Sequence, residues 1–271
     1  MLNKRNNKLI VIAALCALAI SFILLIRLQQ NGQAMQKKIT GNASQSDDDL
    51  NYANTAITFS DSQGNLISVP AFQPNGDGSV IVNNNEPYFS RDDLTNPDPW
   101  YEFSDIDDYG RAGVSNAVVG KESMQTKERG SLSEITPSGW YACKANLASD
   151  HGVRDGCQRS HLIANKLLGS VSDDKRNLIT GSAMFNQIYM LPWEKKVMQA
   201  CENGLHVRYR VMPVFDSDDG IAGAETAHGV LMEAESIEDS GASVRFCVYV
   251  YNAEPGWTCD YLTGEWERIQ S

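Results

Sequence analysis

The segment at residues 157–196 constrains the fold more than any other part of the chain. It begins with CQRSHLIA, whose apolar setting is typical of the end of a strand, and a polar loop with a glycine follows. Next, SAMFNQIYM has a helix-like pattern, and Pro192 suits the first turn of a further helix, for which Gly204 is the natural C-terminal cap. The segment is therefore expected to fold as strand, loop and helix.

The regions on either side are expected to be mainly β. SGWYACKANL is predicted to form a strand that pairs with DGCQRSHLIA after the loop at residues 148–156. Three later runs, HVRYRVMPVF, GVLMEAESIE and VRFCVYVYN, have the β-branched and aromatic residues of sheet strands. Shorter alternating runs within residues 57–83 predict one or two small strands at the edge of the domain. Together these elements predict an α+β fold with an antiparallel sheet as its core.

Polar side chains with complementary chemistry are concentrated in the same segment. His161 can act as a general base toward water, because histidine side chains titrate near neutral pH. Asn186 offers a neutral carbonyl oxygen, a hard ligand that suits Mg²⁺. Glu194 can hold the water shell of that metal, and Arg159 can meet phosphate charge in a transition state. This set has the parts of a one-metal phosphodiesterase.

The charge balance of the chain is acidic, with a formal net charge of −11 over 271 residues. This counts against a protein that coats nucleic acid, because such proteins bind by neutralising many phosphates. It does not exclude an enzyme, which needs positive charge only along one cleft and obtains part of it from a metal. Net charge therefore leaves an enzyme that acts on nucleic acid open.

The run R-x-H-L-I, followed by K-R-N-L-I-T-G, M-F-N-Q and M-L-P-W-E, resembles the DNA/RNA non-specific endonucleases with the ββα-metal fold. Within this family the chain looks closest to the membrane-bound DNA-entry nucleases. The likeness continues through GRAGVSNAVVGKE, YRVMPVF and VYVYNAEPGWTCDYLTGE, and covers about residues 80–266. It implies a ββα-metal active-site motif and metal-dependent hydrolysis of phosphodiester bonds in DNA, with RNA as a second candidate substrate.

The resemblance implies a role for five residues. His161 would deprotonate the attacking water, and Asn186 would ligate the metal. Glu194 would orient metal-bound water, and Asn177 would hold the imidazole or the phosphate by hydrogen bonding. Arg159 would neutralise the charge of the pentacovalent transition state. Many members carry Asp-Arg-Gly-His where this chain has Gln-Arg-Ser-His, so the supporting Asp of the motif is replaced.

The resemblance also implies a cofactor and a way of holding the substrate. A single protein ligand, with waters completing an octahedron, suits Mg²⁺, and Mn²⁺ is the alternative metal. Contacts confined to phosphate and sugar carry little base information, so low sequence specificity is expected. The candidate phosphate-binding residues are basic side chains near the motif, namely Lys127, Arg129, Lys175, Arg176, Lys195 and Lys196.

Residues 9–26, LIVIAALCALAISFILLI, form an unbroken apolar run of about the length that spans a bilayer as a helix. Lys4, Arg5 and Lys8 precede this run, which predicts a cytoplasmic N-terminus with the bulk of the chain outside. The expected parts are a cytoplasmic tip with a transmembrane anchor at 1–27, a polar flexible stalk at 28–56, and an extracellular nuclease domain at 57–271. Secretion after cleavage of a signal peptide is the alternative.

Five cysteines follow the apolar run, and an oxidising compartment would permit disulfide bonds among them. Cys143 and Cys157 bracket a polar loop that a bond between them would close. Cys247 and Cys259 flank an expected turn, so a bond across that hairpin is a second candidate. Structural or free thiols are the alternative for these residues and for Cys201. Pairing cannot be deduced from sequence, and no Cys/His cluster has the spacing of a zinc site.

Two functions of different class follow from these observations. The first is an active nuclease at the outer cell surface, which would pass DNA to an uptake machinery. The second is a catalytically weak surface module that binds nucleic acid or a partner protein, which the changed residues beside Arg159 keep open. A serine or cysteine hydrolase fits less well, because no GxSxG motif is present. His151 belongs to no comparable constellation, and His206 and His228 are expected to be structural.

Overall fold

The computed structural model describes residues 56–125, 130–147, 156–215 and 223–270. None of the helices in these ranges is long and apolar enough to cross a membrane. The predicted anchor at 1–27 and the predicted stalk up to residue 55 lie outside the described residues, so both stay predictions.

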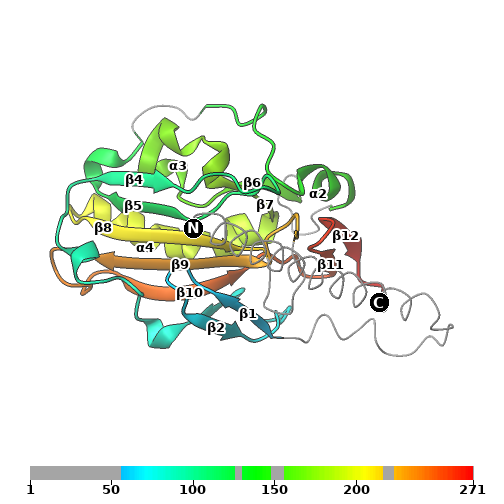
Figure 1. Ribbon diagram of the computed structural model, residues 1–271, viewed down its shortest axis with the longest axis horizontal. Coiled ribbons are helices and arrows are strands. Elements are labelled where there is room, and N and C mark those ends of the chain that lie inside the picture. Colours follow the sequence, from blue (N-terminus) through cyan, green and yellow to red (C-terminus); the bar gives the residue numbers. More distant parts are fainter. Residues whose placement is uncertain (1–55, 126–129, 148–155, 216–222, 271) are drawn as a thin grey trace, which may run out of the picture. The chain divides into compact units, whose positions relative to one another are not determined.

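A six-stranded antiparallel sheet forms the centre of the structure (Figure 1). Its three long strands correspond to the three β-rich runs of the sequence, and they are almost completely buried on both faces. In register, Val211 lies between Met232 of one neighbouring strand and Ser115 of the other. The predicted α+β fold with an antiparallel core is confirmed. The strands lie in the order β3 (Ser79–Ile81), β10 (Arg245–Tyr251), β9 (Gly229–Ser236), β8 (Val207–Val214), β5 (Ser115–Val119) and β4 (Trp100–Phe103).

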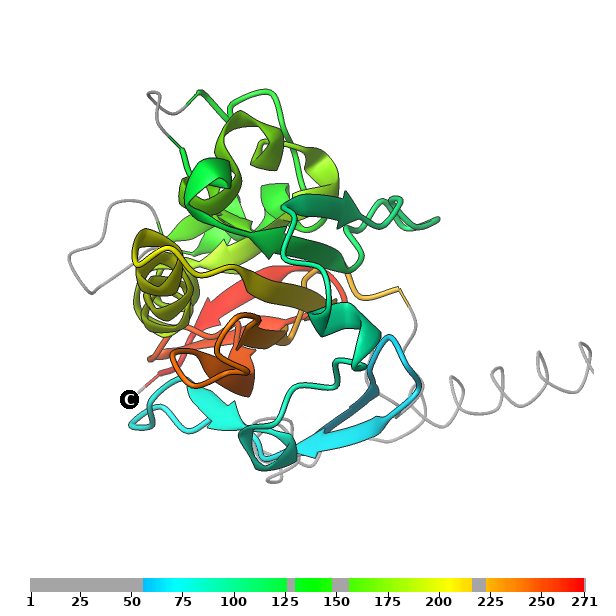
Figure 2. The ribbon, with the colours of Figure 1, turned by 90° about the vertical axis from the view of Figure 1, so that its left-hand side faces the viewer.

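Both faces of this sheet are covered by other elements. Neighbouring side chains of β8 point to opposite faces, so that Tyr209 joins one hydrophobic cluster and Met212 the other. α4 (Leu191–Glu202) packs in the first cluster, and the hairpin of β1 (Ile57–Ser60) and β2 (Leu66–Val69) packs in the second. Figure 2 shows α4 and this hairpin on opposite sides of the sheet.

A second hairpin lies between β5 and β8 in the sequence. β6 (Cys157–His161) pairs antiparallel with β7 (Leu178–Ser182), so that residue 157 lies opposite residue 182. β7 leads into a π-helical turn, η8 (Phe185–Tyr189), and then directly into α4, with Pro192 in its first turn as predicted. Two strands followed by a helix is the order of the ββα motif that the sequence predicts.

The region predicted as the strand at 138–147 is a helix, α2 (Trp140–Asn146). Its buried residues Trp140 and Cys143 are three positions apart, whereas Tyr141 is exposed, and this is helical spacing. Gly139 precedes the helix with a φ of 68°, a left-handed conformation that glycine adopts readily. The strand prediction is therefore wrong, and β7 is the partner of β6.

One buried amide joins the second hairpin to the central sheet. Asn252, which follows β10, accepts a hydrogen bond from the backbone N–H of Ser182 at 2.9 Å. It donates to the carbonyl oxygens of Thr180 at 3.1 Å and Ala227 at 2.9 Å. Because Asn252 is fully buried, these bonds form away from water, and they hold β7 against the chain that enters β9.

Short elements complete the fold. β11 (Trp257–Asp260) and β12 (Glu265–Arg268) form a hairpin, and Trp266 of this hairpin packs against Trp140 of α2. α3 (Asn165–Leu168) follows β6 after a short link. Short 3₁₀ turns lie at Asn83–Asn85, Asp92–Leu94, Lys121–Ser123, Gly169–Ser172 and Lys175–Asn177.

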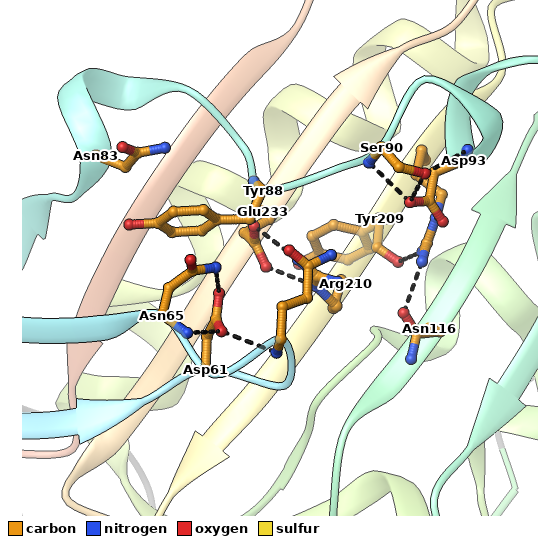
Figure 3. A network of polar contacts seen from close by, with 12 residues as sticks. Asp61, Asn65, Asn83, Tyr88, Ser90, Asp93, Asn116, Tyr209, Arg210 and Glu233 are labelled. Atoms are coloured by element: carbon orange, nitrogen blue, oxygen red, sulfur yellow. Dashed lines mark hydrogen bonds and ion pairs between the residues drawn. The ribbon is translucent and has the colours of Figure 1, made fainter.

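A buried ion pair lies on the second face of the sheet (Figure 3). Arg210 of β8 donates two hydrogen bonds to Glu233 of β9, at 2.6 and 3.0 Å. Glu233 also accepts a bond from the backbone N–H of Tyr88 at 2.7 Å, and Arg208 lies 3.6 Å from Asp93. Because these charges are paired, the network holds the crossing segment on the sheet.

Candidate active site

His161 is the last residue of β6, and only 7% of it is exposed. Its Nε2 atom lies 2.9 Å from the Oδ1 atom of Asp173. Asp173 follows the 3₁₀ turn Gly169–Ser172, in the segment that connects β6 with β7. A carboxylate at this distance fixes both the orientation and the tautomer of the imidazole, as a base that acts on water requires.

Sequence reasoning missed Asp173. It stands in the polar run Ser172-Asp173-Asp174-Lys175, which is typical of a solvated loop and carries no motif. The contact exists because the loop folds back over the end of β6. Asn165 supports this return, since its Nδ2 atom lies 3.2 Å from Oδ1 of Asp173 and 3.0 Å from Oγ of Ser172.

Asn177 is fully buried directly before β7, and its amide forms four hydrogen bonds. Its Oδ1 atom accepts from Oγ of Ser115 and from the backbone N–H of Ile163, both at 2.9 Å. Its Nδ2 atom donates to the carbonyl oxygens of Ile163 at 2.9 Å and Ser172 at 3.0 Å. The amide therefore fixes the chain just after His161 to the turn just before Asp173, which is a positioning geometry.

Asn186 lies in the π-helical turn η8 and is half-buried. Its side-chain amide makes no hydrogen bond to any other residue of the described ranges, unlike the buried amides of Asn177 and Asn252. A π-helical turn widens the helix by one residue, and such turns are frequent at functional sites. The carbonyl oxygen of Asn186 is therefore available for an external partner.

Glu194 lies in the first turn of α4 and is buried. Burial, and after it the negative charge of Glu194, raises the pKa of the Tyr209 phenol well above its ordinary value. The carboxylate of Glu194 is thus close to Tyr209 of β8, beneath the helix. Pro192 at the helix start and the preceding turn η8 place Glu194 two helical turns after Asn186 on the same continuous run of chain.

Arg159 lies on the same face of β6 as His161, two residues earlier. Its guanidinium donates hydrogen bonds to the carbonyl oxygens of Ile135 and Ser133, and it stacks on Trp140 at 3.8 Å from the ring centroid. These contacts join β6 to α2 and to the segment before it. In this structure the guanidinium thus has structural partners, in addition to the phosphate role expected from the sequence.

The predicted phosphate-binding residues are mostly exposed. Lys175 is exposed, and Arg176 is held by Asp174 through two Arg–carboxylate contacts, which hold the pKa of Asp174 below its ordinary value. Arg176 also lines an open pocket of about 390 Å³ beside β4. Lys195 and Lys196 lie on the exposed side of α4, and Lys127 and Arg129 lie outside the described residues.

The other histidines have separate surroundings. His206 lies between two carboxylates, with Nδ1 2.5 Å from Glu238 and Nε2 2.9 Å from Glu122. The ring of His228 stacks on Tyr261 at 4.0 Å between centroids. Neither histidine lies beside His161 in sequence or in these contacts, and His151 lies outside the described residues.

The residues present fit a hard divalent cation better than a thiophilic one. Within the described ranges, no group of three His, Cys, Asp or Glu side chains is arranged to hold a metal ion. The available donor is the amide oxygen of Asn186, with the carboxylate of Glu194 on the same helical run. One neutral oxygen ligand with a shell of water is the coordination that Mg²⁺ accepts and that a structural zinc site does not.

Comparisons with known proteins agree with this arrangement. A model of the family described as DNA/RNA non-specific endonuclease matches residues 95–234. No curated protein matches the chain. The matched range includes β4, β5, the whole ββα region, β8 and most of β9.

Three solved structures are similar to the chain. NucA from Streptococcus agalactiae with magnesium ion bound has 25% identity and a TM-score of 0.60, over 71% of this chain and 87% of that one. The same protein with no metal bound has 24% identity and a TM-score of 0.60, over 71% and 88%. Sda1 nuclease with bound zinc ion has 20% identity and a TM-score of 0.55, over 73% and 98%. These similarities confirm the mixed α+β fold around a six-stranded antiparallel sheet.

Proposed function

Because the chain belongs to the DNA/RNA non-specific endonuclease family, whose members are phosphodiester hydrolases, we propose that His161 is its general base and that it cleaves DNA without sequence specificity. The observation that carries this proposal is the 2.9 Å contact between His161 and Asp173 at the end of β6. In this reading Asp173 keeps the imidazole oriented, and His161 takes the proton from the attacking water. RNA is a second substrate of the same chemistry, since the phosphodiester bond is common to both.

Asn186 and Glu194 are proposed to hold a divalent cation and its water shell. The unpartnered amide of Asn186 and the chemistry of the donor set support Mg²⁺, with Mn²⁺ as the alternative. The similar NucA structure holds magnesium, and the similar Sda1 structure holds zinc. When bound, the cation would supply Lewis-acid stabilisation of the departing oxygen.

The remaining site residues are proposed to position the reacting groups. Asn177 fixes the chain that follows His161, and Arg159 joins β6 to α2 while its charge favours the phosphate. Because contacts to phosphate and sugar carry little base information, cleavage would have low sequence specificity. The proposed phosphate-binding side chains are Lys127, Arg129, Lys175, Arg176, Lys195 and Lys196.

We further propose that the nuclease domain lies outside the cell, anchored by residues 1–27 through the stalk at 28–56. The apolar run at 9–26 and the basic residues before it support this topology, as they would for a DNA-entry nuclease that passes a strand to an uptake machinery. Protease added to intact cells should then remove the domain but leave an N-terminal tag on the cytoplasmic side. Loss of the tag, or release of the intact domain into the medium, would favour signal cleavage.

The function is tested with the purified full-length chain and supercoiled plasmid, in Mg²⁺ or in EDTA. The matched variants are His161→Ala and His206→Gln, two histidines of which only the first belongs to the proposed site. Metal-dependent nicking that is lost in the first variant and kept in the second supports the proposal. Tight DNA binding without cleavage in any divalent metal would instead favour a surface module that binds nucleic acid. Cleavage that survives in His161→Ala would keep the function and overturn the mechanism.

A further inference from the structure

Three cysteines gather in one hydrophobic cluster beside the ββα hairpin. Cys143 of α2 is fully buried and Cys157, the first residue of β6, is 3% exposed, and both belong to the same cluster of side chains. Cys259 of β11 packs against the rim of this cluster. All three side chains are thiols in the structure. The fold therefore brings together residues that are up to 116 positions apart in the sequence.

We propose that Cys143 and Cys157 form a disulfide bond that ties α2 to β6. Both side chains lie in the interface where α2 packs on β6, and the stack of Trp140 on Arg159, at 3.8 Å, keeps the same two elements together. The bond would thus follow a contact that other side chains already make. It would also attach covalently to the strand that ends in His161.

The thiols interact most closely within this pair. The pKa of Cys143 is raised, first by its hydrogen bond with Cys157, then by burial, and only after these by the charge of Cys259. Cys259 belongs instead to the partly exposed hairpin of β11 and β12, where it lies opposite Trp266. This order favours Cys143 with Cys157 and leaves Cys259 as the odd thiol.

The other pairing that the sequence suggested is not brought together. Cys247 lies in the hydrophobic cluster on the second face of the sheet, with Leu231 and Tyr249. Cys259 lies with the tryptophans of α2 and β12, in a separate cluster. A bond between Cys247 and Cys259 across the expected turn is therefore wrong for this fold. Cys201 is buried in a third environment beneath α4, where burial raises the pKa of its thiol to about 12.

The oxidant for this bond is a small disulfide such as oxidised glutathione. Thiol–disulfide exchange joins the two sulfur atoms, and the oxidant is reduced to two thiols that take up both protons and both electrons. Because the native thiols are buried and resist ionisation, exchange is expected during folding and is expected to be slow in the folded protein. The bond is thus a structural tie and not a switch.

The test uses the full-length chain refolded with oxidised glutathione, alkylated in denaturant without reductant and digested with trypsin. Cleavage after lysine and arginine separates the cysteines: Cys143 falls in residues 130–144, Cys157 in 155–159, Cys201 in 197–208, and Cys247 with Cys259 in 246–268. A linked pair of the first two peptides, two hydrogens lighter than their sum, supports the proposal. Linkage of either peptide to 246–268, or full alkylation of all five thiols, would overturn it.

A second measurement separates the bond from the packing of its side chains. The melting temperature of the oxidised wild type should fall by about 6–12 °C on reduction, because the bond closes a loop of 15 residues. The same difference should persist in Cys247→Ser and be absent in Cys143→Ala. A reduction effect that survives in Cys143→Ala would overturn the assignment. Neither measurement depends on nuclease activity, so the proposed function can fail while this inference stands.

Discussion

The Nε2 atom of His161 lies 2.9 Å from Oδ1 of Asp173, although the two residues are twelve positions apart in the chain. The first residue ends a strand, and the second follows a 3₁₀ turn in the connecting loop. Neither local structure determines the contact. It depends on the amides of Asn165 and Asn177, which hold the loop against the end of β6.

Replacement of Asp173 by Asn should lower the rate of plasmid cleavage roughly 10- to 100-fold, because the imidazole loses the carboxylate that orients it. His161→Ala should lower it further, by about 10²–10⁴-fold. The rates are measured at saturating DNA, so that a loss of turnover is separated from a loss of binding.

Asp174→Asn is the matched control for this prediction. Its carboxylate binds Arg176 and makes no printed contact with His161. This variant should keep turnover and change at most the apparent affinity for DNA. Equal loss of turnover in the two variants would show that the loop as a whole, and not the contact with His161, is responsible.

Replacement of Asn186 by Ala should raise the Mg²⁺ concentration needed for half-maximal cleavage, because the proposed protein ligand is lost. Gln187→Ala is the control, since it removes the neighbouring half-buried amide of the same π-helical turn. Activity is titrated against Mg²⁺, and metal affinity is measured separately by calorimetry. An unchanged Mg²⁺ dependence in Asn186→Ala would contradict the assignment of the ligand.

The contact of His206 with two carboxylates predicts a pH dependence of stability. The pKa of His206 is raised, first by its hydrogen bond with Glu122 and also by that with Glu238. A raised pKa means that the stabilisation is complete below about pH 6.5, the unfolded value, and is lost as pH rises through the folded value. The pKa values of Glu122 and Glu238 are lowered by His206, so their contribution is lost as pH falls through their folded values, below about pH 4.5.

The melting temperature should therefore exceed that of His206→Gln most between about pH 4.5 and 6.5, and the difference should shrink toward pH 9. Glu238→Gln, which removes one of the two carboxylates, should show a weaker pH dependence than the wild type. A difference between wild type and His206→Gln that is constant from pH 5 to pH 9 would exclude this explanation.

Replacement of Glu233 by Gln should reduce the free energy of unfolding by about 3–5 kcal/mol, because it leaves the charge of Arg210 buried without its partner. The change is measured by urea denaturation. Glu235→Gln is the control, since its partner Arg245 is partly exposed and such pairs contribute roughly 0–1 kcal/mol. Similar losses in both variants would contradict the importance of burial for this pair.

The sequence predicted the long strands and α4 well, because their patterns are dominated by local preferences. Strands β8, β9 and β10 are rich in β-branched and aromatic residues, and Pro192 and Gly204 mark the two ends of α4. The strand predicted at 138–147 failed for a physical reason. Its apolar residues suit either periodicity over so short a run, and the packing of Trp140 against Trp266 and Arg159 selects the helix.

The site was predicted in part. His161, Asn186 and Glu194 stand in motifs with a recognisable order, and no measurement in the structure assigns their roles. The partners of Arg159 could not be predicted, because Ile135 and Ser133 act through backbone carbonyl oxygens that any residue would supply. The same limit applies to Asp173, whose contact depends on how a loop folds back.

Strands β5 and β8 lie side by side in the sheet, but residues 120–206 separate them in the sequence. The proposed base and the proposed metal ligand both lie inside this long closed segment. Bringing its ends together has an entropic cost that grows with length, so this pairing is expected to form late in folding. A chain that emerges from synthesis would then lack an assembled cleavage centre until its most distant neighbouring strands have met. Delayed assembly of this kind would protect the nucleic acids of the producing cell.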